Sequence, residues 1–122
     1  MTVSLTSAFY LLCAAVAIGG VLALPYLRIP LRRLPWPIRV AHGAFGGAGL
    51  GMLLLALYHG LPPSTMGTTG FGQAAAVFIA LALVLGLTIA LFRVRPIGVL
   101  VAFHAGLAIA GFVVLWTLVS LI

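Results

Sequence analysis

Two of the three histidines in this chain lie in similar surroundings, which makes them its strongest candidates for binding a cofactor. His42 begins the segment H-G-A-F-G-G-A-G-L-G-M-L, and His104 begins the segment H-A-G-L-A-I-A-G-F-V-V-L. Aligned, the two segments give H-x-x-[FL]-[GA]-x-A-G-[LF]-x-x-L, and each follows a proline and an arginine-bearing stretch. This pattern predicts an internal repeat, although apolar helices rich in Gly and Ala also resemble one another by chance.

The absence of acidic residues removes several kinds of chemistry. The chain contains no Asp and no Glu. This excludes paired-carboxylate catalysis, a Ser-His-Asp triad, carboxylate metal cages and the Asp/Glu proton relays that many pumps and coupled transporters use. Cys13 is the single cysteine, so it forms no intrachain disulfide. We therefore expect that this chain has no set of catalytic residues of its own. At most, we expect it to be an electron-transfer subunit of an oxidoreductase.

Because the repeat places both histidines near the starts of their helices, we expect the two imidazoles at comparable depth. Two neutral imidazoles so placed can bind haem iron, copper or zinc. Structural zinc normally has four ligands, and beyond His42 and His104 the chain offers only His59 and Cys13 as further candidates. Haem needs two axial ligands. Because the sequence has no C-x-x-C-H motif, covalent c-type attachment is excluded. The residues favour one b-type haem between His42 and His104, and the alternative for each histidine is a hydrogen bond to a nearby carbonyl or Thr.

Small residues accompany both histidines at helical spacing, one and two turns farther along the chain. They predict room for a flat macrocycle beside each imidazole, although small residues also permit close helix packing. These candidate cofactor-binding positions are Gly46 and Gly49 after His42, and Ala108 and Gly111 after His104.

The remaining groups around this site are expected to come from the backbone and from arginine. The second ring nitrogen of each histidine needs an acceptor. We expect a carbonyl one turn back, that of Ile38 for His42 and that of Leu100 for His104, because the chain has no carboxylate. Arg39 and its neighbours could pair with haem propionates, while membrane topology and anionic lipid are the other roles of these arginines.

The elements that must position these residues follow from the composition. The chain has 122 residues, of which 65% are hydrophobic and 5% are charged. A soluble domain carries roughly 45–50% apolar and about 25% charged residues. Since one helical crossing takes about 20 apolar residues, the sequence predicts a single all-α bundle of four transmembrane helices, built as two parallel-repeat hairpins. The apolar runs cover about residues 5–27, 38–60, 71–92 and 97–121, and the first is interpreted as a retained helix rather than a cleaved signal.

The net charge of +6 predicts the orientation of these helices. All six basic residues are arginines in or directly beside the first and third connections: Arg28, Arg32, Arg33, Arg39, Arg93 and Arg95. They form short clusters between apolar runs and not a solvated basic face, so nucleic acid is not an expected partner. The positive-inside rule places these connections in the cytoplasm and both termini outside. We expect a bacterial inner membrane with periplasmic termini.

The architecture and the two histidine segments resemble membrane b-type cytochromes, in particular the cytochrome b561-like four-helix bundles. The resemblance covers roughly a quarter of the chain. It implies axial histidines from two helices and electron transfer across the membrane. The sequence departs from the family in one respect, because those bundles usually hold two histidine pairs and two haems. His59 lies 17 residues after His42, about 25 Å along the helix, and has no partner histidine.

These observations lead to one favoured function and two alternatives. The favoured function is a haem b-binding electron-transfer subunit of a respiratory or photosynthetic complex, with other membrane subunits, lipid and a quinone as candidate partners. The second hypothesis is a cofactor-free accessory subunit of such a complex. The third is a copper- or solute-handling protein that uses His42, His104 and Met52 or Met66. We expect His59 to lie near the outer interface and not to bind haem.

Overall fold

The apolar runs form four long helices in the computed structural model, which describes residues 3–28, 34–61, 67–92 and 95–122. The helices are α1 (Val3–Ala23), α2 (Trp36–Tyr58), α3 (Thr68–Leu91) and α4 (Ile97–Leu121), and a 3-10 turn at Leu24–Leu27 follows α1. The described residues include no strand. Each helix is long and apolar enough to cross a membrane. The prediction of an all-α, four-helix membrane protein is therefore confirmed.

Proline and glycine set the helix ends, which differ from the predicted boundaries by a few residues. Pro25 lies in the 3-10 turn, so the α-helix ends at Ala23 and not at residue 27. Pro37 occupies the first turn of α2, where a missing N–H leaves no bond unmade, and α2 begins one residue earlier at Trp36. At the other end of α2, Gly60 has a positive φ of 83°, and the chain leaves the helix after Tyr58.

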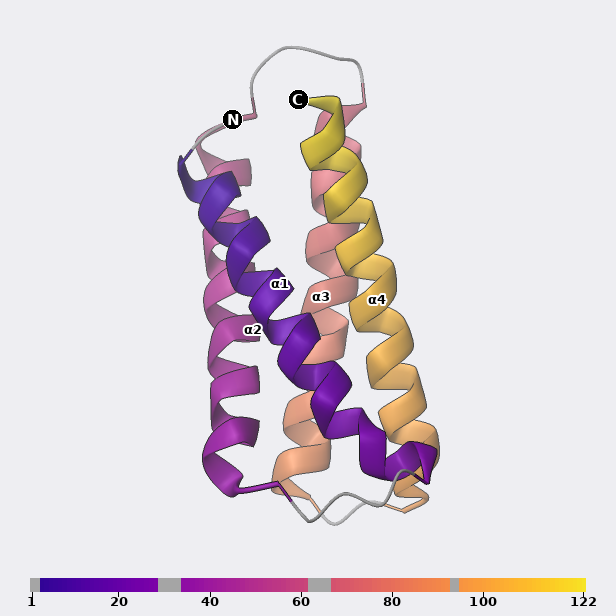
Figure 1. The fold of residues 1–122 in the computed structure, drawn as a ribbon. Coiled ribbons are helices and arrows are strands. Elements are labelled where there is room, and N and C mark those ends of the chain that lie inside the picture. Colours follow the sequence, from indigo (N-terminus) through magenta and orange to yellow (C-terminus); the bar gives the residue numbers. More distant parts are fainter. Residues whose placement is uncertain (1–2, 29–33, 62–66, 93–94) are drawn as a thin grey trace.

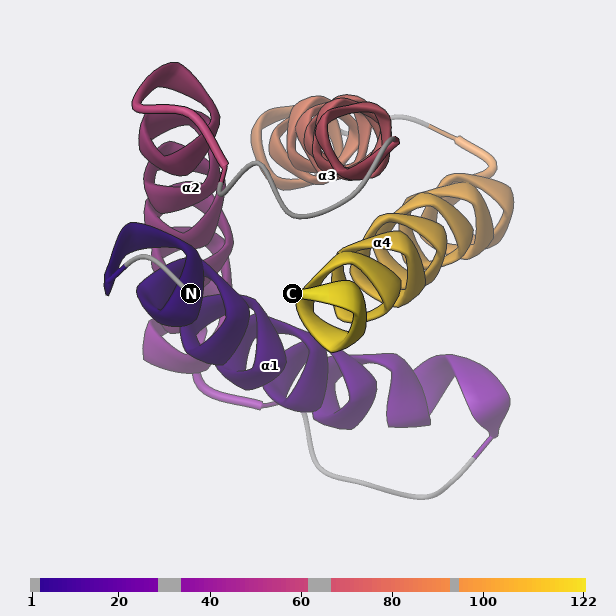
Figure 2. The same cartoon turned by 90° about the horizontal axis from the view of Figure 1, so that it is seen from above.

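The four helices run alternately up and down around a common axis (Figure 1). Both termini, the end of α2 and the start of α3 lie at one end of the bundle, and the other helix ends lie at the opposite end. Viewed from above, the helices follow one another around the bundle in chain order (Figure 2). The most extensive packing joins α1 to α2 and α3 to α4, with smaller contacts between α2 and α3 and between α1 and α4. Consequently α2 and α4 face each other diagonally.

The two hairpins pack internally in the same way, which confirms the predicted repeat. In the first hairpin, a Cβ added to Gly49 would lie 2.6 Å from Leu12 Cγ. In the second hairpin, a Cβ added to Gly111 would lie 2.7 Å from Ile79 Cγ1. Each glycine thus lets the two helices of its hairpin approach closely. Leu53 and Leu115, the last residues of the two histidine segments, are both fully buried.

The contacts between the hairpins are not symmetric. On one side, Phe9 of α1 stacks on Phe112 of α4 with ring centroids 5.8 Å apart, and it meets the edge of Trp116 at 5.7 Å. On the other side, a Cβ on Gly72 of α3 would lie 2.6 Å from Leu57 Cδ2 of α2. Aromatic rings therefore hold α1 to α4, whereas a glycine brings α3 close to α2.

The outer surface of the bundle is apolar over its length. Large hydrophobic side chains are exposed on every helix, among them Val21, Leu54, Val84 and Val113. Such a surface suits lipid tails and not water.

We expect the substitution Leu53→Ala to destabilise the bundle by about 1–3 kcal/mol, less than the roughly 2–5 kcal/mol typical of soluble cores. The reason is that packing alone is lost in lipid, since the hydrophobic driving force between helices is absent there. The free energy of unfolding can be measured by denaturing-detergent titration in mixed micelles. The matched control is Leu54→Ala, because Leu54 is 52% exposed and lipid can fill the vacated space. Equal losses in both variants would contradict the packing described here.

Candidate functional site

His42 and His104 meet between the diagonal helices α2 and α4. Their ring centroids are 5.8 Å apart and the ring planes are inclined at 79°. Both residues are half-buried, and each lies about two turns from the start of its helix. The expectation that the two imidazoles share one depth is therefore confirmed. The pair lies toward the end of the bundle where α2 and α4 begin (Figure 1).

Each imidazole is held by a backbone carbonyl of the other helix in its own hairpin. The distance from His42 Nδ1 to the Ala15 carbonyl oxygen on α1 is 2.9 Å. The distance from His104 Nδ1 to the Ala82 carbonyl oxygen on α3 is 2.8 Å. A carbonyl oxygen can only accept, so Nδ1 carries the proton in both rings. In a neutral imidazole this leaves the lone pair on Nε2, which is the atom available to bind a metal.

The expected acceptors for these N–H groups were wrong. Ile38 and Leu100 lie one turn before the histidines on the same helices, but the bonds go to Ala15 and Ala82 on the neighbouring helices. The physical reason is direction, because each imidazole extends sideways into the contact between the two helices of its hairpin. There the nearest carbonyl belongs to the partner helix.

Two glycines that the sequence analysis missed lie directly against the rings. A Cβ added to Gly19 would lie 2.8 Å from His42 Cε1, and a Cβ added to Gly86 would lie 2.9 Å from His104 Cε1. Both distances are shorter than any ordinary carbon contact. The signal was present in the sequence, because Ala15-x-x-x-Gly19 and Ala82-x-x-x-Gly86 repeat the same spacing. It would have been found by extending the repeat search to the first and third helices.

The small residues predicted to make room for a macrocycle fall into two groups. Gly49 and Gly111 contact Leu12 and Ile79 within their hairpins, so the space beside them is filled by helix packing. Gly46, one turn after His42, is half-buried, yet an added Cβ there would meet no atom within 4 Å. Ala108 occupies the equivalent place after His104 and is also half-buried. A side chain at Gly46 would therefore meet open space.

The arginines that the structure describes lie toward the same end of the bundle as the histidine pair. Arg39 is exposed and precedes His42 by one turn of α2, and Arg28 and Arg95 are exposed beyond the ends of α1 and α3. Arg32, Arg33 and Arg93 lie outside the described residues. None of the six can form an ion pair with an acidic side chain of this chain, which has none. Anionic groups for Arg28, Arg39 and Arg95 must come from another molecule.

His59 is separated from the pair by most of the length of α2. It is the exposed C-cap residue of that helix, and its ring meets the edge of the Tyr58 ring with centroids 5.5 Å apart. Within residues 3–28, 34–61, 67–92 and 95–122, no three His, Cys, Asp or Glu side chains are grouped to hold a metal ion. The site therefore offers two ligands. Of the residues considered for copper, Met52 is half-buried and Met66 lies outside the described residues.

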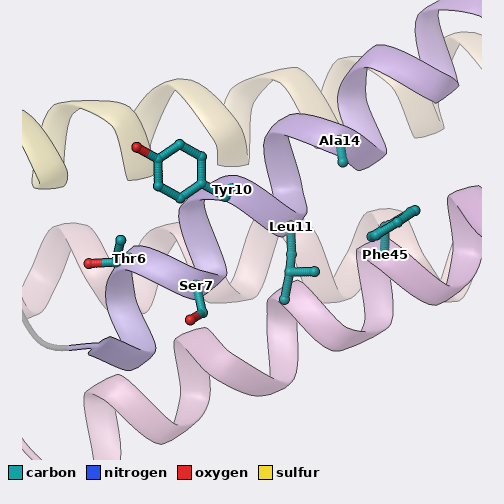
Figure 3. Close-up of a pocket in the computed structure, with 6 residues that line it drawn as sticks. All are labelled: Thr6, Ser7, Tyr10, Leu11, Ala14 and Phe45. Atoms are coloured by element: carbon teal, nitrogen blue, oxygen red, sulfur yellow. The ribbon is translucent and has the colours of Figure 1, made fainter.

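A shallow groove runs along the outer side of α1 (Figure 3). Its lining comes from α1 and, at one end, from Phe45 of α2, one turn after His42: Thr6, Ser7, Tyr10, Leu11, Ala14 and Phe45. The groove is open and mostly apolar. A lipid tail has the right chemistry to fill it.

We expect a carbon–carbon correlation spectrum of histidine-labelled protein in lipid to show cross-peaks between the rings of His42 and His104. The rings are close enough for magnetisation transfer, since their centroids are 5.8 Å apart. The chain has three histidines, so single His→Gln variants can assign the signals. His59 is the internal control and should give no ring-to-ring cross-peak with either. Loss of the His42–His104 cross-peak in folded protein would contradict the diagonal arrangement.

In comparisons with known proteins, no family model, no curated protein and no solved structure matches this chain. The resemblance to the cytochrome b561-like bundles therefore stays a prediction that depends on two short motifs. What the chain can do has to be argued from its own geometry, in which two imidazoles with matched backbone partners meet inside an apolar bundle.

Proposed function

We propose that this protein is a membrane-embedded subunit that binds one b-type haem between α2 and α4 and transfers electrons within a larger redox complex. His42 and His104 would hold its iron. The observation that carries the proposal is the matched hydrogen bonding of the two rings, which leaves Nε2 as the free nitrogen of each imidazole. A haem held by two imidazoles supplies one-electron transfer.

The separation of the rings fits a single metal ion bound from two sides. A bond between a metal and an imidazole nitrogen is about 2 Å long, so one ion would be within reach of two nitrogens up to about 4 Å apart. The ring centres then lie somewhat farther apart than the nitrogens. The centroid separation of 5.8 Å is near this range, so both imidazoles would be close enough to hold one ion. No atom lies within 4 Å of a Cβ added to Gly46, one turn after His42, so this position would not obstruct a bound macrocycle.

The donor set favours haem over the other metals considered. Two neutral imidazoles with no thiolate or carboxylate beside them do not complete a structural zinc site. A haem would need only two ligands from the protein, which His42 and His104 would provide, and the apolar helices would cover its apolar surface. Exposed Arg28, Arg39 and Arg95 have no acidic partner within the chain, so they can pair with haem propionates or with lipid phosphates.

A single ligand pair limits the electron path. The pair lies toward one end of the bundle, and the third histidine is exposed at the opposite end of α2 without a second histidine beside it. This placement of the two histidines would suit electron exchange with a quinone or with another subunit of the complex, rather than transfer across the whole membrane. The chain supplies binding and orientation and has no catalytic group of its own.

The second candidate function is a cofactor-free accessory subunit of a membrane complex. One observation favours it, namely that each imidazole already has a hydrogen-bond partner at Nδ1 without any metal. In that case the histidines contribute to helix packing alone. The two functions differ in a property that is simple to measure, the visible absorption of the purified protein.

We expect purified protein, expressed with an adequate haem supply, to show a reduced-minus-oxidised spectrum of low-spin b-type haem. His42→Ala and His104→Ala should each remove most of this signal, because one imidazole cannot replace two axial ligands. The double variant should lose little more than either single variant. The matched control is His59→Ala, which should keep the full signal. A colourless wild-type protein that is folded and monodisperse would overturn haem binding and favour the accessory subunit.

We expect the arginine-bearing end of the bundle to face the cytoplasm, with both termini in the periplasm, when the protein lies in a bacterial inner membrane. Single cysteines at Leu34 and at Ser64, in a Cys13→Ser background, report the two ends. A membrane-impermeant thiol reagent added to intact cells should label position 64 and leave position 34 unlabelled until the membrane is opened. Labelling of position 34 alone would reverse the orientation.

A further inference from the structure

We propose that Gly19 and Gly86 are the positioning residues of the two imidazoles. Each glycine opens a backbone carbonyl to Nδ1 of one histidine, and thereby fixes the tautomer that leaves Nε2 free to bind a metal. The part of this inference that concerns the imidazoles stands on contacts within the chain. The part that concerns haem rests on the proposed function above.

The first step is the geometry of an α-helix. A side chain points toward the helix N-terminus and covers the turn before its own Cα. The side chain of residue 19 would therefore lie over the turn that holds the Ala15 carbonyl. With glycine at position 19, this carbonyl is accessible from the side, and His42 Nδ1 reaches it at 2.9 Å. A methyl group at residue 19 would lie 2.8 Å from His42 Cε1 and would displace the ring.

The second step is that the same arrangement occurs again in the other hairpin. Gly86 lies four residues after Ala82, as Gly19 does after Ala15. His104 Nδ1 lies 2.8 Å from the Ala82 carbonyl oxygen, and a Cβ on Gly86 would lie 2.9 Å from His104 Cε1. Neighbouring glycines do not share this contact, since a Cβ on Gly20 would meet no atom within 4 Å. The close approach is specific to the glycine that faces the ring.

The third step is the consequence for a bound metal. The partner of the second ring nitrogen fixes the orientation and the basicity of an imidazole ligand. Adding a Cβ at residue 19 or 86 would push the ring away from its carbonyl and allow the other tautomer, in which Nε2 carries the proton and cannot bind. Loss of such a partner typically weakens metal binding by about 10–100-fold. The two glycines thus act on the metal through the histidines.

The first experiment reads the imidazoles in haem-free protein, by nitrogen NMR of histidine-labelled samples in lipid nanodiscs. In wild type, His42 and His104 should both show a hydrogen-bonded, protonated Nδ1. Gly19→Ala should change the Nδ1 signal of His42 and leave that of His104 unchanged, and Gly86→Ala should do the reverse. Gly20→Ala and Gly106→Ala are the matched controls, because a Cβ at either position meets no atom within 4 Å. They should change neither signal.

An unchanged His42 signal in folded Gly19→Ala protein would overturn the proposal, as would an equal change in Gly20→Ala. Folding is checked by size-exclusion chromatography and helical circular dichroism. If Gly19→Ala alone fails to fold, Gly86→Ala and the His104 signal provide the same test in the other hairpin. Failure of both alanine variants to fold would assign the glycines to helix packing and would also overturn the positioning role.

The second experiment uses the haem-loaded protein. Gly19→Ala and Gly86→Ala should each weaken haem affinity by at least about 10-fold, while Gly20→Ala and Gly106→Ala retain it. The midpoint potential of residual haem should rise, because a less basic imidazole stabilises the oxidised iron less. If wild type binds no haem but the NMR changes occur as described, the proposed function fails and the positioning role stands. If haem binds normally in both variants, the positioning role fails and the proposed function stands.

Discussion

The structure depends on one constraint, which is that hydrocarbon offers no hydrogen-bond partner to a polar group. The backbone groups of the helices form hydrogen bonds within each helix. The hydroxyl groups of Thr88, Thr117 and Ser120 donate to the carbonyl oxygens four residues earlier. Without any acidic side chain, backbone carbonyls are also the partners of the imidazoles. A carbonyl inside a helix already accepts one bond, so a second donor can reach it only from the side. Gly19 and Gly86 provide that access.

The two imidazole bonds orient the site and do not hold the bundle together. A hydrogen bond between transmembrane helices stabilises by about 0.6 kcal/mol on average. Packing within each hairpin is more extensive, with Leu12 seated on Gly49, Ile79 seated on Gly111, and fully buried leucines nearby. Because packing rather than these hydrogen bonds stabilises each hairpin, we expect a hairpin to stay folded when its imidazole loses the hydrogen bond to the carbonyl. Orientation of the imidazoles is therefore separable from stability.

Apolar length predicted the four helices, and the repeat predicted the matched depth of His42 and His104. The same reasoning could not identify the carbonyls that accept hydrogen bonds from the two imidazoles. Helical periodicity assigns residues to a face of their own helix, but it does not state how far a neighbouring helix is rotated. The partners at Ala15 and Ala82 depend on that rotation. Periodicity did place Gly49 on the histidine side of α2, since both residues pack on α1, but it could not show that Leu12 fills the space beside this glycine.

The repeat explains how a short chain can bring two imidazoles together. Each hairpin carries one histidine with its own carbonyl and glycine, so each half is complete as a holder of one imidazole. The pair exists only where the halves meet, and its spacing is set by the contacts between hairpins. Those contacts differ on the two sides, with stacked Phe9 and Phe112 on one and Gly72 against Leu57 on the other. Because the two interfaces differ, the hairpins pack against each other in one relative position. That position sets the distance of 5.8 Å between the ring centroids of His42 and His104.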